Sequence, residues 1–312
     1  MLVNTNFINC KKINLIIVFC VNILITGASG YIANHCARKL FSAGYSLFGI
    51  DLIPPQTTTL FQEFYTGDCG NIEQLRQITQ DHPIDYVIYA SGSTDTMDCE
   101  NNPLPYYMND VSGMLFTLSA LRNTNGIIFL SCLQGDFPIT THQKIKNTVE
   151  NILSSFHGAY NLSYIALRVT DVLGVHPQSE SGPNNFHILR RLISPEPSLP
   201  AIIRRDYNFV HIEDVTEAVL CALNRIRTLS ADYYDVAGKK WISIEQFAQH
   251  VEQCTHRKVT LPQYISPEVS NFSKQKIDTY RTQRELNWHL QYPDLDPMIL
   301  STVDWLRQHG KL

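Results

Sequence analysis

A glycine-rich turn follows the apolar run Ile23–Ile25 and leads directly into a segment with helical spacing. Gly27 allows the chain to turn sharply after a strand, and Gly30 allows backbone amides to approach a bound group closely. The helix expected over 31–43 would point the positive end of its dipole at that group. These residue types in this order favour the binding of a pyrophosphate.

Asp51 follows the second strand-like run, Ser46–Ile50, and lies 24 residues after Gly27. A carboxylate at this place accepts hydrogen bonds from the hydroxyls of an adenosine ribose and repels a 2′-phosphate. The next arginine along the chain after Asp51 is Arg76. The pattern therefore favours NAD over NADP. The alternative is an ordinary strand–turn–helix with a surface Asp, but turn, helix and second strand together favour the dinucleotide site.

The bulk composition narrows the class of partner. The chain has 312 residues, a formal net charge of −4 and 17% charged residues, so we expect no nucleic-acid partner. Its eight cysteines form no Cys-x-x-Cys pair, and most stand in apolar runs. We therefore expect a reducing, cytoplasmic location and no structural metal.

The first twenty residues imitate a secretion signal. Lys11 and Lys12 precede an apolar run over 13–20, and 28–30 resembles a cleavage site. The run is too short to span a membrane, and cleavage at 28–30 would destroy the glycine turn, so we expect neither a membrane anchor nor secretion. One hypothesis is that translation starts at Val21 and that 1–20 is an over-extended gene prediction. The intact mass of natively expressed protein would test it.

Strand and helix patterns alternate through the first half of the chain. The expected strands are 23–25, 46–50, 64–68, 85–90, 126–131 and 162–169, and the expected helices are 31–43, 71–80, 103–123 and 142–156. This alternation predicts an α/β fold: a Rossmann-type doubly wound parallel sheet with helices on both faces, formed by an NAD-binding domain over 21–174.

The pattern changes after Gly174. Residues 175–200 are rich in proline and predict a lid with one helix over 185–193. The segment 207–237, with a helix over 213–225 and an edge strand over 233–237, is expected to return to the main sheet. Further helices are expected over 244–254, 274–286 and 298–309. Residues 175–312 thus form a smaller, mixed α/β substrate-binding cap.

With these segments in place, the chain resembles the extended short-chain dehydrogenase/reductases, in particular the NAD-dependent epimerase/dehydratase family. The resemblance covers nearly all of 21–310. The motifs that carry it are Thr26–Ile32, Gly67–Asp68, Val87–Gly92, Tyr106–Asn109, Leu167–Arg168 with Gly174, Phe209–Val215 and Leu286–Trp288. The cofactor contacts that the resemblance implies are Gly27, Ser29, Gly30, Tyr31, Ile32, Asp51, Asp68, Cys69, Ala90, Ser91, Gly92, Asn109 and Lys146.

The catalytic pair of the family is a Tyr and a Lys four residues apart on one helix. The register set by 149–153 places Lys146 at the lysine position and His142 at the tyrosine position. No tyrosine in this chain has a lysine four residues later. The helper hydroxyl of the family falls on Cys132, with Ser131 beside it.

His142 could act as a base. An imidazole has a pKa of about 6.5, and a neighbouring Lys cation lowers it further, so His142 would be a neutral proton acceptor. A surface or capping role at the start of a helix is an equally good interpretation. Lys146 is expected to bind the cofactor ribose. Cys132 is either a nucleophilic or redox thiol or, more commonly for a lone cysteine, a packed small residue.

Other expectations concern substrate and assembly. The resemblance places Asp171 at the substrate-binding Asn of the family and Tyr207 at a phosphate-binding Arg, for which Arg204 and Arg205 could substitute. His211 is expected to be a structural hydrogen-bonding residue. The implied substrate is a UDP- or dTDP-sugar. The implied assembly is a homodimer that pairs through 103–123 and 142–156.

Three functional hypotheses follow. The first is an NAD-dependent enzyme that moves hydride reversibly between a nucleotide sugar and the nicotinamide, with His142 or a water carrying the proton. The second is a catalytically silent NAD-binding sensor or regulator, which the absent Tyr would favour. The third is another reaction on the same fold, such as reduction of a non-sugar ketone.

Overall fold

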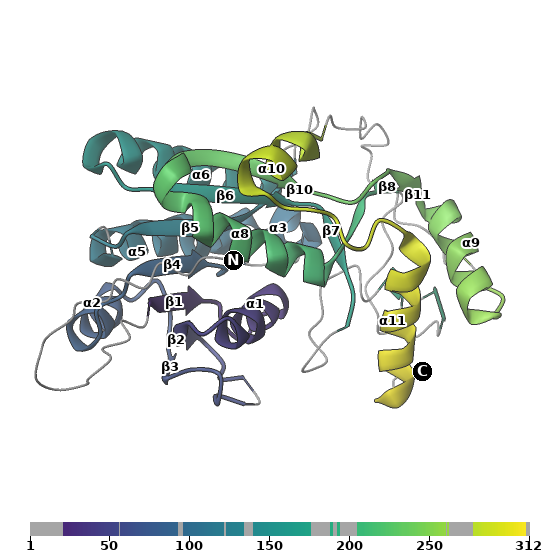
Figure 1. Cartoon of the computed structure of the whole chain (residues 1–312), viewed down its shortest axis with the longest axis horizontal. Coiled ribbons are helices and arrows are strands. Elements are labelled where there is room, and N and C mark those ends of the chain that lie inside the picture. Colours follow the sequence, from purple (N-terminus) through teal and green to yellow (C-terminus); the bar gives the residue numbers. More distant parts are fainter. Residues whose placement is uncertain are drawn as a thin grey trace, which may run out of the picture.

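The computed structural model describes residues 21–55, 57–92, 96–121, 123–133, 140–175, 188–189, 192–193, 205–259, 261 and 277–309. A seven-stranded parallel sheet forms the centre of the molecule (Figure 1). Its strand order is β10-β6-β5-β4-β1-β2-β3. The chain adds β2 and β3 on one side of β1 and then crosses back to add β4, β5, β6 and β10 on the other side, so the strand order reverses between β1 and β4. The strands are β1 (Asn22–Thr26), β2 (Ser46–Asp51), β3 (Glu63–Thr66), β4 (Tyr86–Tyr89), β5 (Gly126–Cys132), β6 (Tyr164–Val169) and β10 (Ala231–Val236).

Helices cover both faces of this sheet because the strands are apolar on both sides. In β1, Ile23 and Ile25 pack on one face with α1 (Tyr31–Ser42) and α8 (Ile212–Leu229), while Leu24 packs on the other. That second face is covered by α2 (Ile72–Asp81), α5 (Gly113–Leu121) and α6 (Thr141–Tyr160). The doubly wound Rossmann-type sheet predicted from the sequence is confirmed.

The expected helix over 103–123 is interrupted. The chain forms α3 (Thr96–Asn101) and α4 (Pro103–Tyr107), and a five-residue π-turn, η1 (Met108–Ser112), then separates α4 from α5. The uniform helix predicted from the apolar stripe was therefore wrong at its centre. A π-turn adds a residue to the helical turn, and the periodicity of apolar residues does not reveal such an insertion.

The second part of the chain forms a separate, smaller apolar core. It is built from two short two-stranded pairings, β7 with β9 and β8 with β11, together with α9 and α11. These elements are β7 (Asp171–Leu173), β8 (Asp206–Tyr207), β9 (Phe209–His211), β11 (Ile242–Ser243), α9 (Ile244–Thr255) and α11 (Leu295–Gln308). In Figure 1, α9 and α11 lie beyond one end of the sheet. The sequence predicts a short strand from Tyr207 leading into the helix over 213–225, but not the other short strands, since two or three residues carry no readable pattern.

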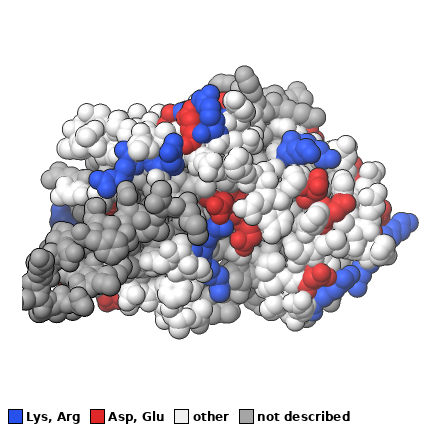
Figure 2. Space-filling model, in the orientation of Figure 1, with Lys and Arg blue, Asp and Glu red and all other residues white. Residues whose placement is uncertain are grey.

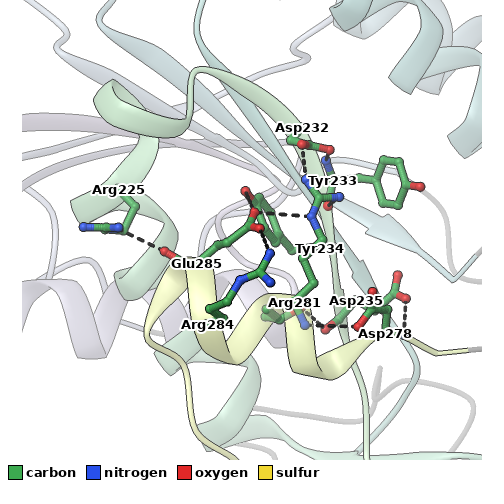
Figure 3. A network of polar contacts seen from close by, with 10 residues as sticks. Arg225, Asp232, Tyr233, Tyr234, Asp235, Asp278, Arg281, Arg284 and Glu285 are labelled. Carbon is green, nitrogen blue, oxygen red and sulfur yellow. Dashed lines mark hydrogen bonds and ion pairs between the residues drawn. The ribbon is translucent and has the colours of Figure 1, made fainter.

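Of the segment 207–237, which was expected to return to the main sheet, β10 does so as an edge strand, whereas β8 and β9 pair with β11 and β7 instead. The helix α10 (Thr279–Leu286) is fastened to β10 by the polar network of Figure 3. Arg281 pairs with Asp232 and donates to the Tyr233 carbonyl at 3.3 Å, and the amide of Asp278 donates to Asp235 at 2.9 Å. The helix therefore supplies partners to an edge that would otherwise be open.

Trp288 connects the C-terminal segment to the body of the fold. Its side chain is fully buried, and its indole N–H donates to the Asp214 carbonyl at 2.8 Å. The Asp214 carboxylate in turn accepts from the amides of Gln291 and Tyr292 at 2.7 and 3.1 Å. α8 thereby positions the chain that leads to α11.

Several expectations fall outside the described residues. They are the extension 1–20, most of the lid 175–200 with its helix over 185–193, Arg204, and the start of the helix expected from 274. None of the described helices is long and apolar enough to cross a membrane. On the face seen in Figure 2, acidic and basic residues stand in small interspersed groups. The boundary at 174 stays a prediction.

Candidate active site

The turn after β1 leaves no room for a side chain at Gly27. Its φ is +62°, and a Cβ would lie 2.9 Å from the Ala90 carbonyl oxygen and from the Ser91 backbone. The Gly30 amide closes the turn by donating to the Gly27 carbonyl at 2.9 Å. The predicted contacts Gly27, Gly30, Ala90 and Ser91 therefore meet where β1 and β4 end side by side.

The start of α1 is open to an anion. Gly30 is its N-cap and provides no side-chain cap, and the first turn carries no acidic residue. The positive end of the α1 dipole therefore faces the glycine turn with no carboxylate in the first turn to neutralise it, an arrangement that favours a bound anion. Within that first turn Tyr31 is buried, which raises the pKa of its phenol well above the usual value. Ile32 is half-buried and packs against the core.

Asp51, predicted as a contact of the adenosine ribose, lies beside the glycine turn. Its carboxylate accepts from the Ser29 amide at 2.9 Å, and the Ser29 hydroxyl donates to the Ile53 carbonyl at 2.5 Å. The chain after β2 is thus fastened to the glycine turn. Leu52 and Ile53 follow as exposed apolar residues, 64% and 71% exposed. The ribose contact of Asp51 stays a prediction.

Asp68 and Cys69 stand in the turn after β3. The Asp68 carboxylate is exposed and accepts from the Gly70 amide at 2.7 Å. The Cys69 thiol is buried 3.7 Å from the Tyr89 hydroxyl, and burial raises its pKa. Because β3, β2 and β1 lie side by side and parallel, this turn shares the sheet edge of the glycine turn.

Lys146 lies at the centre of the candidate catalytic groups. It is only 7% exposed, and its ammonium nitrogen lies 3.3 Å from Oδ2 of Asp110, which is 3% exposed. Both groups meet Gly92, where a Cβ would lie 2.6 Å from the Lys146 nitrogen. Three elements therefore converge here: the chain after β4, the π-turn and α6. Sequence reasoning missed Asp110, although an acid inside an apolar helical stripe is a signal for a buried charge.

Asn109, predicted as a cofactor contact, is exposed on the π-turn and donates to Oδ1 of Asp110 at 2.9 Å. Its contact with a cofactor stays a prediction. The structure places its neighbour Asp110, and not Asn109, beside Lys146.

His142 stands in the first turn of α6, four residues before Lys146. Thr140 caps this helix with a capping box, so the cap that His142 could have supplied is already made. Burial and then the Lys146 charge lower the pKa of His142 to about 4, against smaller raising effects of Asp110 and Glu100. The imidazole is therefore neutral near pH 7, as expected for a proton acceptor.

Ser131 and Cys132 end β5 with different surroundings. The Ser131 hydroxyl donates to Oε1 of Glu150 at 2.6 Å, and Arg168 donates to the two oxygens of Glu150 at 3.1 and 2.6 Å. The hydroxyl is thus engaged in a buried ionic network. Burial raises the pKa of Cys132 to about 12. This argues against a thiolate nucleophile and for the interpretation of Cys132 as a packed residue.

Asp171 and Arg205, both predicted as substrate-binding, bind each other. The guanidinium donates to the two carboxylate oxygens at 2.5 and 3.1 Å and lies 4.0 Å from the centre of the Tyr207 ring. The Asn208 amide donates to the same carboxylate at 3.0 Å. Contact of this pair with a substrate stays a prediction.

His211 is the N-cap of α8. Its Nδ1 accepts from the Glu213 amide at 3.3 Å, and its ring stacks on Tyr292 with centroids 3.9 Å apart. Burial lowers its pKa to about 4. These contacts give His211 the structural role expected from the sequence. Within the described parts of the chain, no group of three or more metal-ligating side chains is placed to hold a metal ion.

Comparison with known proteins agrees with this geometry. The sequence profile of the NAD dependent epimerase/dehydratase family matches residues 23–237. The UDP-glucose 4-epimerase of Lactobacillus helveticus is 22% identical over 93% of this chain and 98% of its own length. A probable UDP-arabinose 4-epimerase of Oryza sativa subsp. japonica is 22% identical over 93% of this chain and 83% of its own.

Solved structures show the same fold. The UDP-glucose 4-epimerase of Thermotoga maritima with UDP-glucose superposes with a TM-score of 0.79 at 20% identity, covering 93% of this chain and all of that one. Pal from Bacillus thuringiensis reaches a TM-score of 0.81 at 18% identity, with the same coverage.

The fold and the glycine turn define a dinucleotide-binding enzyme of the Rossmann type. The chain belongs to the NAD dependent epimerase/dehydratase family, with NAD as its cofactor. The uncapped start of α1, the closed approach at Gly27 and the carboxylate of Asp51 fit such a cofactor.

The close backbone approach at Gly27 predicts how one added methyl group there would change NAD affinity. Gly27→Ala should weaken NAD binding by more than about tenfold, because the Cβ would push the turn away from Ala90 and Ser91. Calorimetric titration with NAD measures this. Gly44→Ala is the matched control, since Gly44 also has positive φ (+89°) but open space around a Cβ. Gly44→Ala should lose about 1–2 kcal/mol of stability from its positive φ alone, and Gly27→Ala should lose more because the Cβ also clashes with backbone. Equal NAD affinities of the two variants would contradict the assignment.

The lowered pKa of His211 predicts part of the loss of folding stability at acid pH. The unfolded chain binds a proton at this residue near pH 6.5, whereas the folded protein does so near pH 4. The unfolded state therefore binds more protons between these values, and stability falls as the pH falls through this window. His211→Asn, which keeps a capping acceptor, should flatten that fall in urea unfolding at pH 7, 6, 5 and 4.5. Parallel curves for the two proteins would refute the prediction.

Proposed function

We propose that this protein epimerises a nucleotide-activated sugar by reversible hydride transfer to and from NAD. The observation that carries the proposal is the meeting of Gly92, Lys146 and Asp110 beside the glycine turn at one sheet edge. The support for a nucleotide sugar is that relatives matched along most of their length are UDP-glucose and UDP-arabinose 4-epimerases. The substrate class proposed is a UDP- or dTDP-sugar.

The chain's own residues divide the work as follows. The α1 amides and Asp51 bind the diphosphate and the adenosine ribose, and Lys146 binds the nicotinamide ribose. NAD supplies a reversible acceptor for the hydride that leaves the sugar carbon. An imidazole nitrogen of His142, directly or through a water, accepts the proton of the sugar hydroxyl and later returns it. Because that acceptor is reversible, inversion of the sugar carbon would need no external oxidant.

The smaller part of the chain would hold the sugar nucleotide. Asp171 and Arg205 stand at its junction with the sheet, where β7 pairs with β9 directly after β6. We propose that Arg205 contacts the substrate diphosphate, supported by its fork geometry. Asp171 then fixes the orientation of the guanidinium.

Residue 142 provides the sharpest test of the chemistry. His142→Phe should lower interconversion of UDP-glucose and UDP-galactose about a hundredfold or more, the usual contribution of general base catalysis. Its affinity for NAD should stay within about twofold. His142→Tyr should retain or raise turnover, because a phenol beside Lys146 is the arrangement typical of the family. A panel of UDP- and dTDP-sugars, followed by NMR, measures this.

One result would contradict the proposed reaction, and another would contradict only the role of His142. Absence of turnover on the whole panel by the NAD-loaded wild type would exclude epimerisation of these sugars. Full activity of His142→Phe would exclude His142 as the proton acceptor and leave the reaction assignment intact.

We further propose a homodimer that forms through α4, η1, α5 and α6. The support is a set of exposed apolar residues on α4, η1 and α5: Leu104 (68%), Met108 (60%), Leu115 (40%) and Phe116 (37%). The same residues of a second copy would cover them, as in an isologous interface. We also propose a cytoplasmic location, supported by the absence of a Cys-x-x-Cys pair from the sequence and by the position of most of its cysteines in apolar runs.

The proposed dimer interface predicts that a charge placed within it separates the two chains. Met108→Lys should convert a two-chain mass into a one-chain mass in size exclusion with light scattering, because an uncompensated ammonium would be buried. Leu300→Lys, at a 41% exposed leucine on α11, is the control and should leave the mass unchanged. A one-chain mass for the wild type at micromolar concentration would overturn the assembly.

A further inference from the structure

Two buried charges of opposite sign meet at the candidate catalytic site, and one of them has no assigned role. The Asp110 carboxylate and the Lys146 ammonium are 3% and 7% exposed and lie 3.3 Å apart. Removing two charges from water is costly, and the cost is offset only when the partners are well placed. They come from different elements, the π-turn and α6, so the pair depends on how these elements pack.

The surroundings hold the Asp110 carboxylate in one place. The Asn109 amide group donates to Oδ1 at 2.9 Å, which leaves Oδ2 for Lys146. The π-turn leaves Met108 and Asn109 exposed and Asp110 buried. At Gly92, φ is +142°, and a Cβ would lie 2.8 Å from Oδ2 and 2.6 Å from the Lys146 nitrogen. The chain after β4 thus approaches both charges without a side chain between them.

We propose that Asp110 is the positioning residue of this site: it holds the Lys146 ammonium below Gly92, where the lysine meets the cofactor ribose. This inference rests on the proposed function for its ribose contact. A lysine side chain loses much rotamer freedom when it is fixed. Asp110 removes that loss from the binding step, because Lys146 is already ordered before the cofactor arrives.

Asp110 also acts on His142. Burial lowers the pKa of His142 most, the Lys146 charge lowers it further, and the charges of Asp110 and Glu100 raise it. Among the residues that the structure describes, these three are the ionisable groups that influence His142, and they come from α6, η1 and α3. A purely packing role of Asp110 would not change the titration of His142.

The first experiment is a double-mutant cycle on NAD affinity with the full chain. Asp110→Asn, which keeps the shape and removes the charge, should weaken NAD binding about tenfold by calorimetry. In the Lys146→Met background the same change should have almost no effect, because the group that it positions is gone. Asp235→Asn, a buried carboxylate on β10, is the control and should leave NAD affinity unchanged. Equal effects of Asp110→Asn in both backgrounds would overturn the proposal.

The second experiment needs no cofactor. Nitrogen-15 NMR of the imidazoles should show that Lys146→Met raises the pKa of His142 toward 6.5, and that adding Asp110→Asn lowers it again. A His142 titration that neither change moves would refute the charge arrangement. If the wild type bound no NAD, the proposed function would fail, while this titration would still decide whether the two charges act together on His142.

Discussion

The close approach of two backbone segments at Gly27 is the constraint on which the rest of the site depends. The turn after β1 touches the chain after β4 so closely that no Cβ fits between them. This contact exists because β1 and β4 are parallel neighbours at the point where strand order reverses, which is where such sheets bind ligands. It sets the start of α1 beside the turn, brings Asp51 onto the turn, and carries Gly92 toward Lys146.

α6 brings the second set of constraints. His142, Lys146 and Glu150 recur every four residues and so share one side of the helix. Each charged member has a partner from another element, Asp110 for Lys146 and Arg168 for Glu150. The Glu150 pair also engages Ser131, the residue beside the family's helper position. α6 therefore cannot slide along the sheet without separating buried charges, and this fixes where His142 stands.

The sequence predicted the sheet and the cofactor turn because both depend on local signals. Apolar runs of β-strand length and the spacing between Gly27 and Asp51 can be read directly from the sequence. The sequence did not predict the π-turn, the ion pair of Asp110 or the mutual pairing of Asp171 and Arg205. Each of these depends on which distant segments pack together. Asn109 was chosen by alignment to a motif, whereas the inward direction of Asp110 follows from one extra residue in a helical turn.

Asp51 and the amides after β1 are proposed to bind the adenosine diphosphate half of NAD. Calorimetric titration of the purified chain with NAD and with NADP tests it most directly. We expect NAD to bind at one site per chain. We expect NADP to bind at least about tenfold more weakly, because the Asp51 carboxylate repels the 2′-phosphate. Equal affinities, or no heat of binding with either dinucleotide, would contradict it.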